Sequence, residues 1–81
     1  MMKLLEAQET VSNLKNILTD AYWGDIYYLA QDESLTLESR EYEVYIEYLG
    51  DLDINAVQRL ITLLLGRTVT LAMGTRQIIV G

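Results

Sequence analysis

The spacing of apolar residues changes at Gly24, and this change favours a fold that combines helices with a sheet. In residues 3–22 apolar positions recur every three or four residues, the period of an amphipathic helix. These positions are Leu4, Ala7, Val11, Leu14, Leu18 and Ala21. Residues 42–48 instead alternate, because Tyr42, Val44, Ile46 and Tyr48 are separated by Glu43, Tyr45 and Glu47. Strict alternation of this kind predicts a strand with one buried face.

The rest of the chain supplies further elements of both kinds. Residues 25–30 and 35–38 are predicted strands around a turn-like 31–34, and residues 68–73 and 76–80 are predicted to form a hairpin around Gly74-Thr75. A second helix is expected from an N-cap at Asp51 or Asp53 to a stop at Gly66. The predicted fold is a single α+β domain, residues 1–81, with two helices packed on one face of a small antiparallel sheet in the order α-β-β-(β)-α-β-β. Residues 35–49 also fit a helical face, and that alternative would make the chain mostly α.

The chain is short, and its stability is therefore expected to be marginal. A domain of 81 residues buries only about 60% of the surface that its unfolded chain exposes. It contains no cysteine or histidine, so neither a disulfide nor a zinc site of the usual ligands can support it. Self-association is the remaining support, and the helical stripe offers a candidate oligomer interface formed by Leu4, Val11, Leu14 and Leu18. The alternative is that this stripe docks on the domain's own sheet.

The residue types also limit the chemistry of the chain. Without histidine or cysteine it lacks the commonest catalytic groups, so we expect a non-enzyme with no cofactor. Residues 51–55 copy the opening of a calcium-binding loop, but Ala56 and Thr62 stand where that loop needs glycine and glutamate, so no metal site is expected. Direct binding to nucleic acid is disfavoured by a net charge of −6. No apolar run is long enough for a membrane span or a signal peptide, and we expect a cytoplasmic protein.

Acidic and aromatic residues are concentrated in the same part of the chain. Residues 20–53 hold ten acids and one arginine, Arg40, for a net charge of −9, and they hold all seven aromatic residues. Tyrosines are enriched in protein interfaces, and a field of one sign steers an oppositely charged partner. We therefore predict a face that docks on a basic protein surface. Its predicted residues are Glu41, Glu43, Tyr45, Glu47, Asp32 and Glu33.

Three functional hypotheses follow from this charge distribution. The first is a non-catalytic interaction module whose basic partner could be a nucleic-acid-binding protein, which it would inhibit by occupying the phosphate site. The second is a structural homo-oligomer in which residues 54–81, with a net charge of +3, contact the acidic part of a neighbouring copy. The third is a small-ligand or enzyme domain with a pocket among the tyrosines. Salt distinguishes the second hypothesis from the others. An assembly held by charge should lose mass above about 0.3 M salt, where the screening length falls to about 6 Å.

Overall fold

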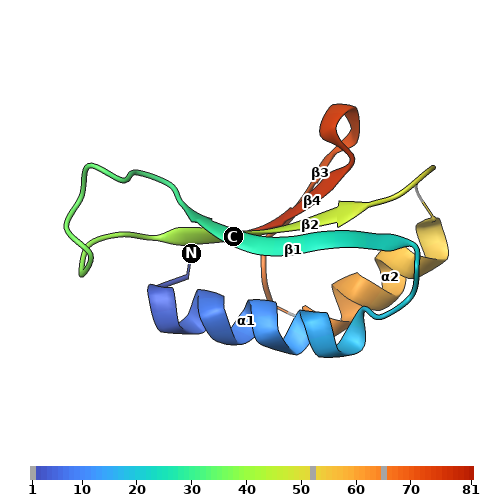
Figure 1. Cartoon of the computed structure of the whole chain (residues 1–81), viewed down its shortest axis with the longest axis horizontal. Coiled ribbons are helices and arrows are strands. Elements are labelled where there is room, and N and C mark those ends of the chain that lie inside the picture. The colour runs from blue at the N-terminus through green and yellow to red at the C-terminus, as the bar shows by residue number, and fades with distance from the viewer. Residues whose placement is uncertain (1, 52, 65) are drawn as a thin grey trace.

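This computed structural model describes residues 2–51, 53–64 and 66–81 (Figure 1). In these residues a helix followed by two strands occurs twice, and the four strands form one sheet. The elements are α1 (Leu4–Ile17), β1 (Trp23–Ala30), β2 (Tyr42–Tyr48), α2 (Ile54–Leu63), β3 (Val69–Ala72), the short 3-10 turn η1 (Met73–Thr75) and β4 (Gln77–Val80). The predicted α+β fold is thereby confirmed.

The sheet is antiparallel throughout, with the strand order β1-β2-β4-β3. β2 lies between β1 and β4, and Ile46 is paired with Ile26 on one side and with Ile78 on the other. Both helices lie against the same face of the sheet, and the tip of the β3–β4 hairpin rises on the opposite side (Figure 1). One face of the sheet is therefore covered by helices and the other is open.

The helix α1 uses its apolar stripe to cover this sheet. Val11 and Leu14 are buried in the core, and Leu4 and Leu18 are partly buried against it. The stripe that was a candidate oligomer interface is thus occupied within the chain, as the docking alternative predicted. The helix ends at Ile17 and not at residue 22, because the chain must turn back into β1.

A second correction concerns the connection between β1 and β2. Residues 35–38 form no strand, and residues 35–49 form no helix. The connection is a loop that extends beyond the sheet (Figure 1). Arg40 organises it by donating hydrogen bonds from Nη2 to the carbonyl of Glu33 (2.7 Å) and from Nε to the carbonyl of Leu35 (3.0 Å). These bonds fold residues 33–40 back on themselves, whereas a strand would need to be extended.

The helix α2 begins at the predicted aspartate cap. Asp53 Oδ1 accepts hydrogen bonds from the backbone N–H groups of Asn55 (2.9 Å) and Ala56 (3.3 Å), which satisfies two of the free donors at the helix start. The inner side of α2 buries Ala56, Val57 and Leu60.

The core fills the space between the helices and the covered sheet face. Its largest fully buried side chains are Met2, Val44, Ile46, Leu60, Ile78 and Val80. Among the described residues no buried residue is polar or charged, so apolar packing holds the layers together. Neither helix has the length and apolar character that a bilayer span needs, within the described part of the chain.

Candidate functional site: the open sheet face

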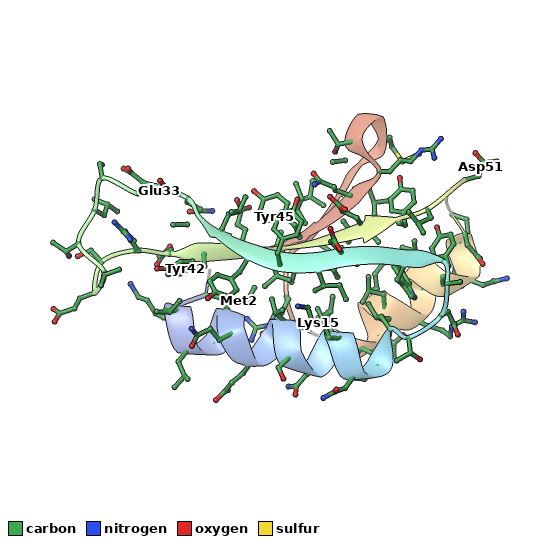
Figure 2. All side chains as sticks on the ribbon, in the orientation of Figure 1. Met2, Lys15, Glu33, Tyr42, Tyr45 and Asp51 are labelled. Atoms are coloured by element: carbon green, nitrogen blue, oxygen red, sulfur yellow. The ribbon has the colours of Figure 1, made fainter. Side chains whose placement is uncertain are left out.

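The alternation in β2 divides its side chains between the core and the open side of the sheet. Tyr42 and Tyr48 are buried, whereas Glu43, Tyr45 and Glu47 are only partly covered. Figure 2 shows Tyr45 on the side of the sheet away from α1, while Tyr42 and Met2 point toward the helix. Neighbouring strands add residues of the same orientation. We call this surface the open sheet face, formed by Asp25, Tyr27, Leu29, Glu43, Tyr45, Glu47, Gln77 and Ile79.

An aromatic pair lies at the centre of the open sheet face. Tyr27 of β1 and Tyr45 of β2 are cross-strand partners, and their rings stack with centroids 5.5 Å apart and planes 9° from parallel. Gln77 of β4 reaches across β2 and donates a hydrogen bond from Nε2 to the Tyr27 hydroxyl (2.6 Å). Stacking holds the two rings against each other, and this bond further restrains the Tyr27 ring. A rigid aromatic surface loses little side-chain entropy when it binds a partner.

Two carboxylates flank this tyrosine pair. The Tyr45 hydroxyl donates a hydrogen bond to Glu43 Oε1 (3.4 Å). Partial burial, followed by the negative charge of Glu43, raises the pKa of Tyr45 above its ordinary value. Partial burial and then the charge of Glu47 raise the pKa of Tyr27 in the same way. Both tyrosines therefore stay neutral near pH 7, and the charge of this surface comes from its carboxylates.

The backbone at Gly24 makes room for one of these carboxylates. A Cβ atom at position 24 would lie 3.2 Å from Glu47 Cβ, which is closer than ordinary side-chain contacts. The pairing of β1 with β2 also shifts register between Trp23 and Ile26, so Gly24 lies within an irregular part of the ladder. Gly24 allows Glu47 to lie close against β1.

The remaining predicted residues lie elsewhere. Glu41 precedes β2 and forms an ion pair with Lys3 (3.9 Å between Nζ and Oε1), which offsets its charge. Asp32 belongs to the β1–β2 loop, where its Oδ1 accepts bonds from the Oγ (2.6 Å) and N–H (3.0 Å) of Ser34. These hydrogen bonds lower the pKa of the Asp32 carboxyl. Glu33 is in the same loop, at one end of the molecule in Figure 2.

The structure therefore brings together Glu43, Tyr45 and Glu47 but not Asp32 or Glu33. It adds Asp25, Tyr27, Leu29, Gln77 and Ile79, which are not among the predicted residues. Alternation within residues 25–30 could have predicted that Tyr27 points to the open face, because its neighbour Ile26 is buried on the other face. Its pairing with Tyr45 depends on the strand register, for which the sequence carries no separate signal.

The open sheet face carries carboxylates that are not neutralised by ion pairs within the described part of the chain. Among the described residues, ion pairs join Lys3 to Glu41 and Arg67 to Glu6, and neither Glu43 nor Glu47 has a cationic partner. The same part of the chain contains no cluster of three potential metal ligands. A cavity of about 320 Å³ lies between the helices, lined by residues that include Asn13, Ile17 and Leu63, and is separate from the open sheet face.

Comparison with known proteins gave no relative from which a function could be transferred, since no family model, no curated protein and no solved structure matches this chain.

Proposed function

We propose that this protein is a non-catalytic interaction module whose open sheet face docks on a basic surface of a partner protein. The observation that carries the proposal is the stacked Tyr27–Tyr45 pair flanked by Glu43 and Glu47, two carboxylates that have no cationic partner among the residues that the structure describes. Aromatic side chains are enriched at interface centres, and complementary charge sets the rate and orientation of docking. The partner proposed here is a protein with clustered lysine and arginine, such as one that binds nucleic-acid phosphates.

The arrangement of charge supports a basic partner more than a second copy bound by acidic-to-basic contacts. A self-complementary assembly would need free cations in residues 54–81. Arg67 is already paired with Glu6 of the same chain (2.6 Å between Nη1 and Oε1). Arg59 lies on α2 and Arg76 lies at the end of the β3–β4 turn, so the two arginines do not form one contiguous basic surface. Within the described part of residues 54–81, the arginines therefore form no basic surface that matches the acidic one.

The test is a comparison of two double variants that carry the same charge change. Glu43→Lys with Glu47→Lys alters the open sheet face, and Glu9→Lys with Asp20→Lys alters exposed positions outside it. Each double variant changes the net charge from −6 to −2. All three proteins are used as bait in lysate of the source organism at moderate and at high salt, and the retained proteins are identified by mass spectrometry.

A basic protein retained by the wild type and by the control pair, lost with the open-face pair and released near 0.3 M salt, supports the proposal. Circular dichroism must show that the open-face variant is folded, as expected for partly exposed positions. Equal retention by both double variants would show that net charge alone drives capture and would refute docking through this face. Retention of nothing by the wild type would also count against the module.

A further inference from the structure

The outer edge of β1 carries backbone groups that have no partner strand. Antiparallel pairs alternate between hydrogen-bonded and non-hydrogen-bonded types. Gln31 donates to the carbonyl of Glu41 (2.9 Å), in register with β1 and β2, so Leu29 and Tyr27 belong to hydrogen-bonded pairs with β2. The N–H and C=O groups of Ile26, Tyr28 and Ala30 therefore point away from β2.

The strand partner of Ala30 confirms this assignment. Tyr42 is opposite Ala30, yet its N–H donates to Met2 (2.7 Å) and its C=O accepts from Met2 (3.4 Å) on the other side of β2. Within the described residues no other group bonds to the outward N–H and C=O groups of Ile26, Tyr28 or Ala30. Six backbone groups are thus available along one edge.

From Ile26 to Ala30 this edge lacks several features that usually prevent strand addition, and the register shift of β1 lies before this part, between Trp23 and Ile26. Natural edge strands are commonly short or carry proline or lysine. β1 has eight residues, contains neither proline nor lysine, and pairs regularly with β2 from Ile26 to Ala30. The opposite edge strand, β3, has only four residues. β1 is therefore the better site for pairing with another chain.

A second copy of the same strand fits this edge. In an antiparallel pair centred on Tyr28, Ile26 lies opposite Ala30 of the second copy, and all six outward backbone groups of each chain face partners. On the open side, Leu29, which is 49% exposed, lies opposite Tyr27 of the second copy. Asp25 lies opposite Gln31, so no like charges are opposed along the strand pair.

We propose that two copies of this chain associate through their β1 edges, forming one continuous eight-stranded antiparallel sheet with a twofold axis at Tyr28. The two open sheet faces then lie on the same side of the joined sheet. This association does not depend on the proposed docking function. Backbone hydrogen bonds and the Leu29–Tyr27 contact hold it together against the repulsion of two chains of net charge −6. Added salt screens that repulsion. The dimer therefore persists at salt concentrations that would dissociate an assembly held by contacts between acidic and basic surfaces.

Sedimentation equilibrium of the purified protein tests the inference directly. At micromolar concentration we expect a mass of twice the 9.3 kDa chain, both at 0.15 M and at 0.5 M salt. Ala30→Pro removes an outward N–H without breaking the ladder to β2, and it should halve the mass. Leu71→Pro is the matched control, because the backbone N–H of Leu71 points outward on the free edge of β3. Removing that N–H should leave the dimer intact.

Each result has a defined consequence. A wild-type mass of 9.3 kDa, a dimeric Ala30→Pro variant that is folded by circular dichroism, or a monomeric Leu71→Pro variant that is folded would each overturn the proposal. If Ala30→Pro unfolds the chain, a cysteine at the twofold axis decides instead.

The native chain has no cysteine, so a single introduced thiol reports one position without background. In the proposed register the two Cα atoms at position 28 are about 5.5 Å apart, within the span of a disulfide. Tyr28→Cys should form a disulfide-linked dimer under mild oxidation in far higher yield than Leu71→Cys on the other edge. Equal yields from the two variants would overturn the proposed register and, with it, the β1 interface.

Discussion

Two leucines of α2 make opposite predictions for the same substitution. Leu60 is fully buried against the sheet, while Leu63, three residues later, is 51% exposed. Leu60→Ala removes buried methyl groups and leaves a cavity, at a cost of about 2–5 kcal/mol. Leu63→Ala gives up only part of a leucine's burial and should cost about 1 kcal/mol or less. Alanine is the better helix former at both positions, so helix propensity does not separate them.

The size of the domain makes this difference easy to measure. A chain of this length is expected to have a free energy of unfolding of about 4–12 kcal/mol, so the Leu60 variant loses a large share of it. With a urea dependence of about 1 kcal/mol per molar, its midpoint should fall by about 2 M or more, against about 1 M or less for Leu63→Ala. Trp23, the single tryptophan, packs against the core, and its ring centroid lies 4.9 Å from that of Tyr22. Its fluorescence reports unfolding.

The comparison depends on the orientation of α2 and on little else. Equal midpoint shifts would mean that the two leucines are equally covered, and a larger shift for Leu63→Ala would mean that α2 presents its other side to the sheet. Either result would refute the described packing. It would also place a different set of side chains in the core beneath β2.

Two further predictions concern the start of α2 and the response of the open sheet face to pH. Asp53→Ala removes the acceptor for the N–H groups of Asn55 and Ala56 and should lower the free energy of unfolding by about 1 kcal/mol, whereas Asp53→Asn should retain most of it, as thermal melts would show. The raised pKa values of Tyr27 and Tyr45 mean that the unfolded chain loses these protons at lower pH than the folded chain. The contribution of these two tyrosines to stability is therefore constant below about pH 10 and falls as the pH rises above it. Replacing both tyrosines by phenylalanine should flatten that fall in urea titrations at several pH values. An unchanged slope in the double variant would contradict the assignment.

Local patterns in the sequence predicted the parts of the fold in which periodicity and burial agree. The alternation of residues 42–48 predicted which side chains of β2 are buried, because a central strand with one covered face must alternate. The Asp53 cap was predictable because its hydrogen bonds reach only two and three residues ahead. Residues 35–38 have strand-forming composition, but the hydrogen bonds of Arg40 to loop carbonyls override that propensity.

The candidate site could be predicted only in part, because its members come from three strands. Glu43, Tyr45 and Glu47 follow from alternation within one strand. Tyr27 and Gln77 join them through the pairing of β1 and β4 with β2, which is set by the whole core and by no local signal. Charge alone predicts Asp32 and Glu33 as site residues, but charge does not determine where a loop places a side chain.

The position of β4 between β2 and β3 has a consequence for the order in which the protein folds. β1 and β2 are joined by a loop and can pair early, whereas β4 reaches β2 only after the roughly 30 residues between them have closed into a large loop. Contacts between distant parts of a chain form slowly, so we expect entry of β4 to limit the folding rate. Until then the inner edge of β2, with Val44 and Ile46, is uncovered. Aggregation during refolding should therefore compete with the pairing of β4 and β2. Substitutions that accelerate this pairing, in which Ile78 is placed beside Ile46, should raise the yield of folded protein.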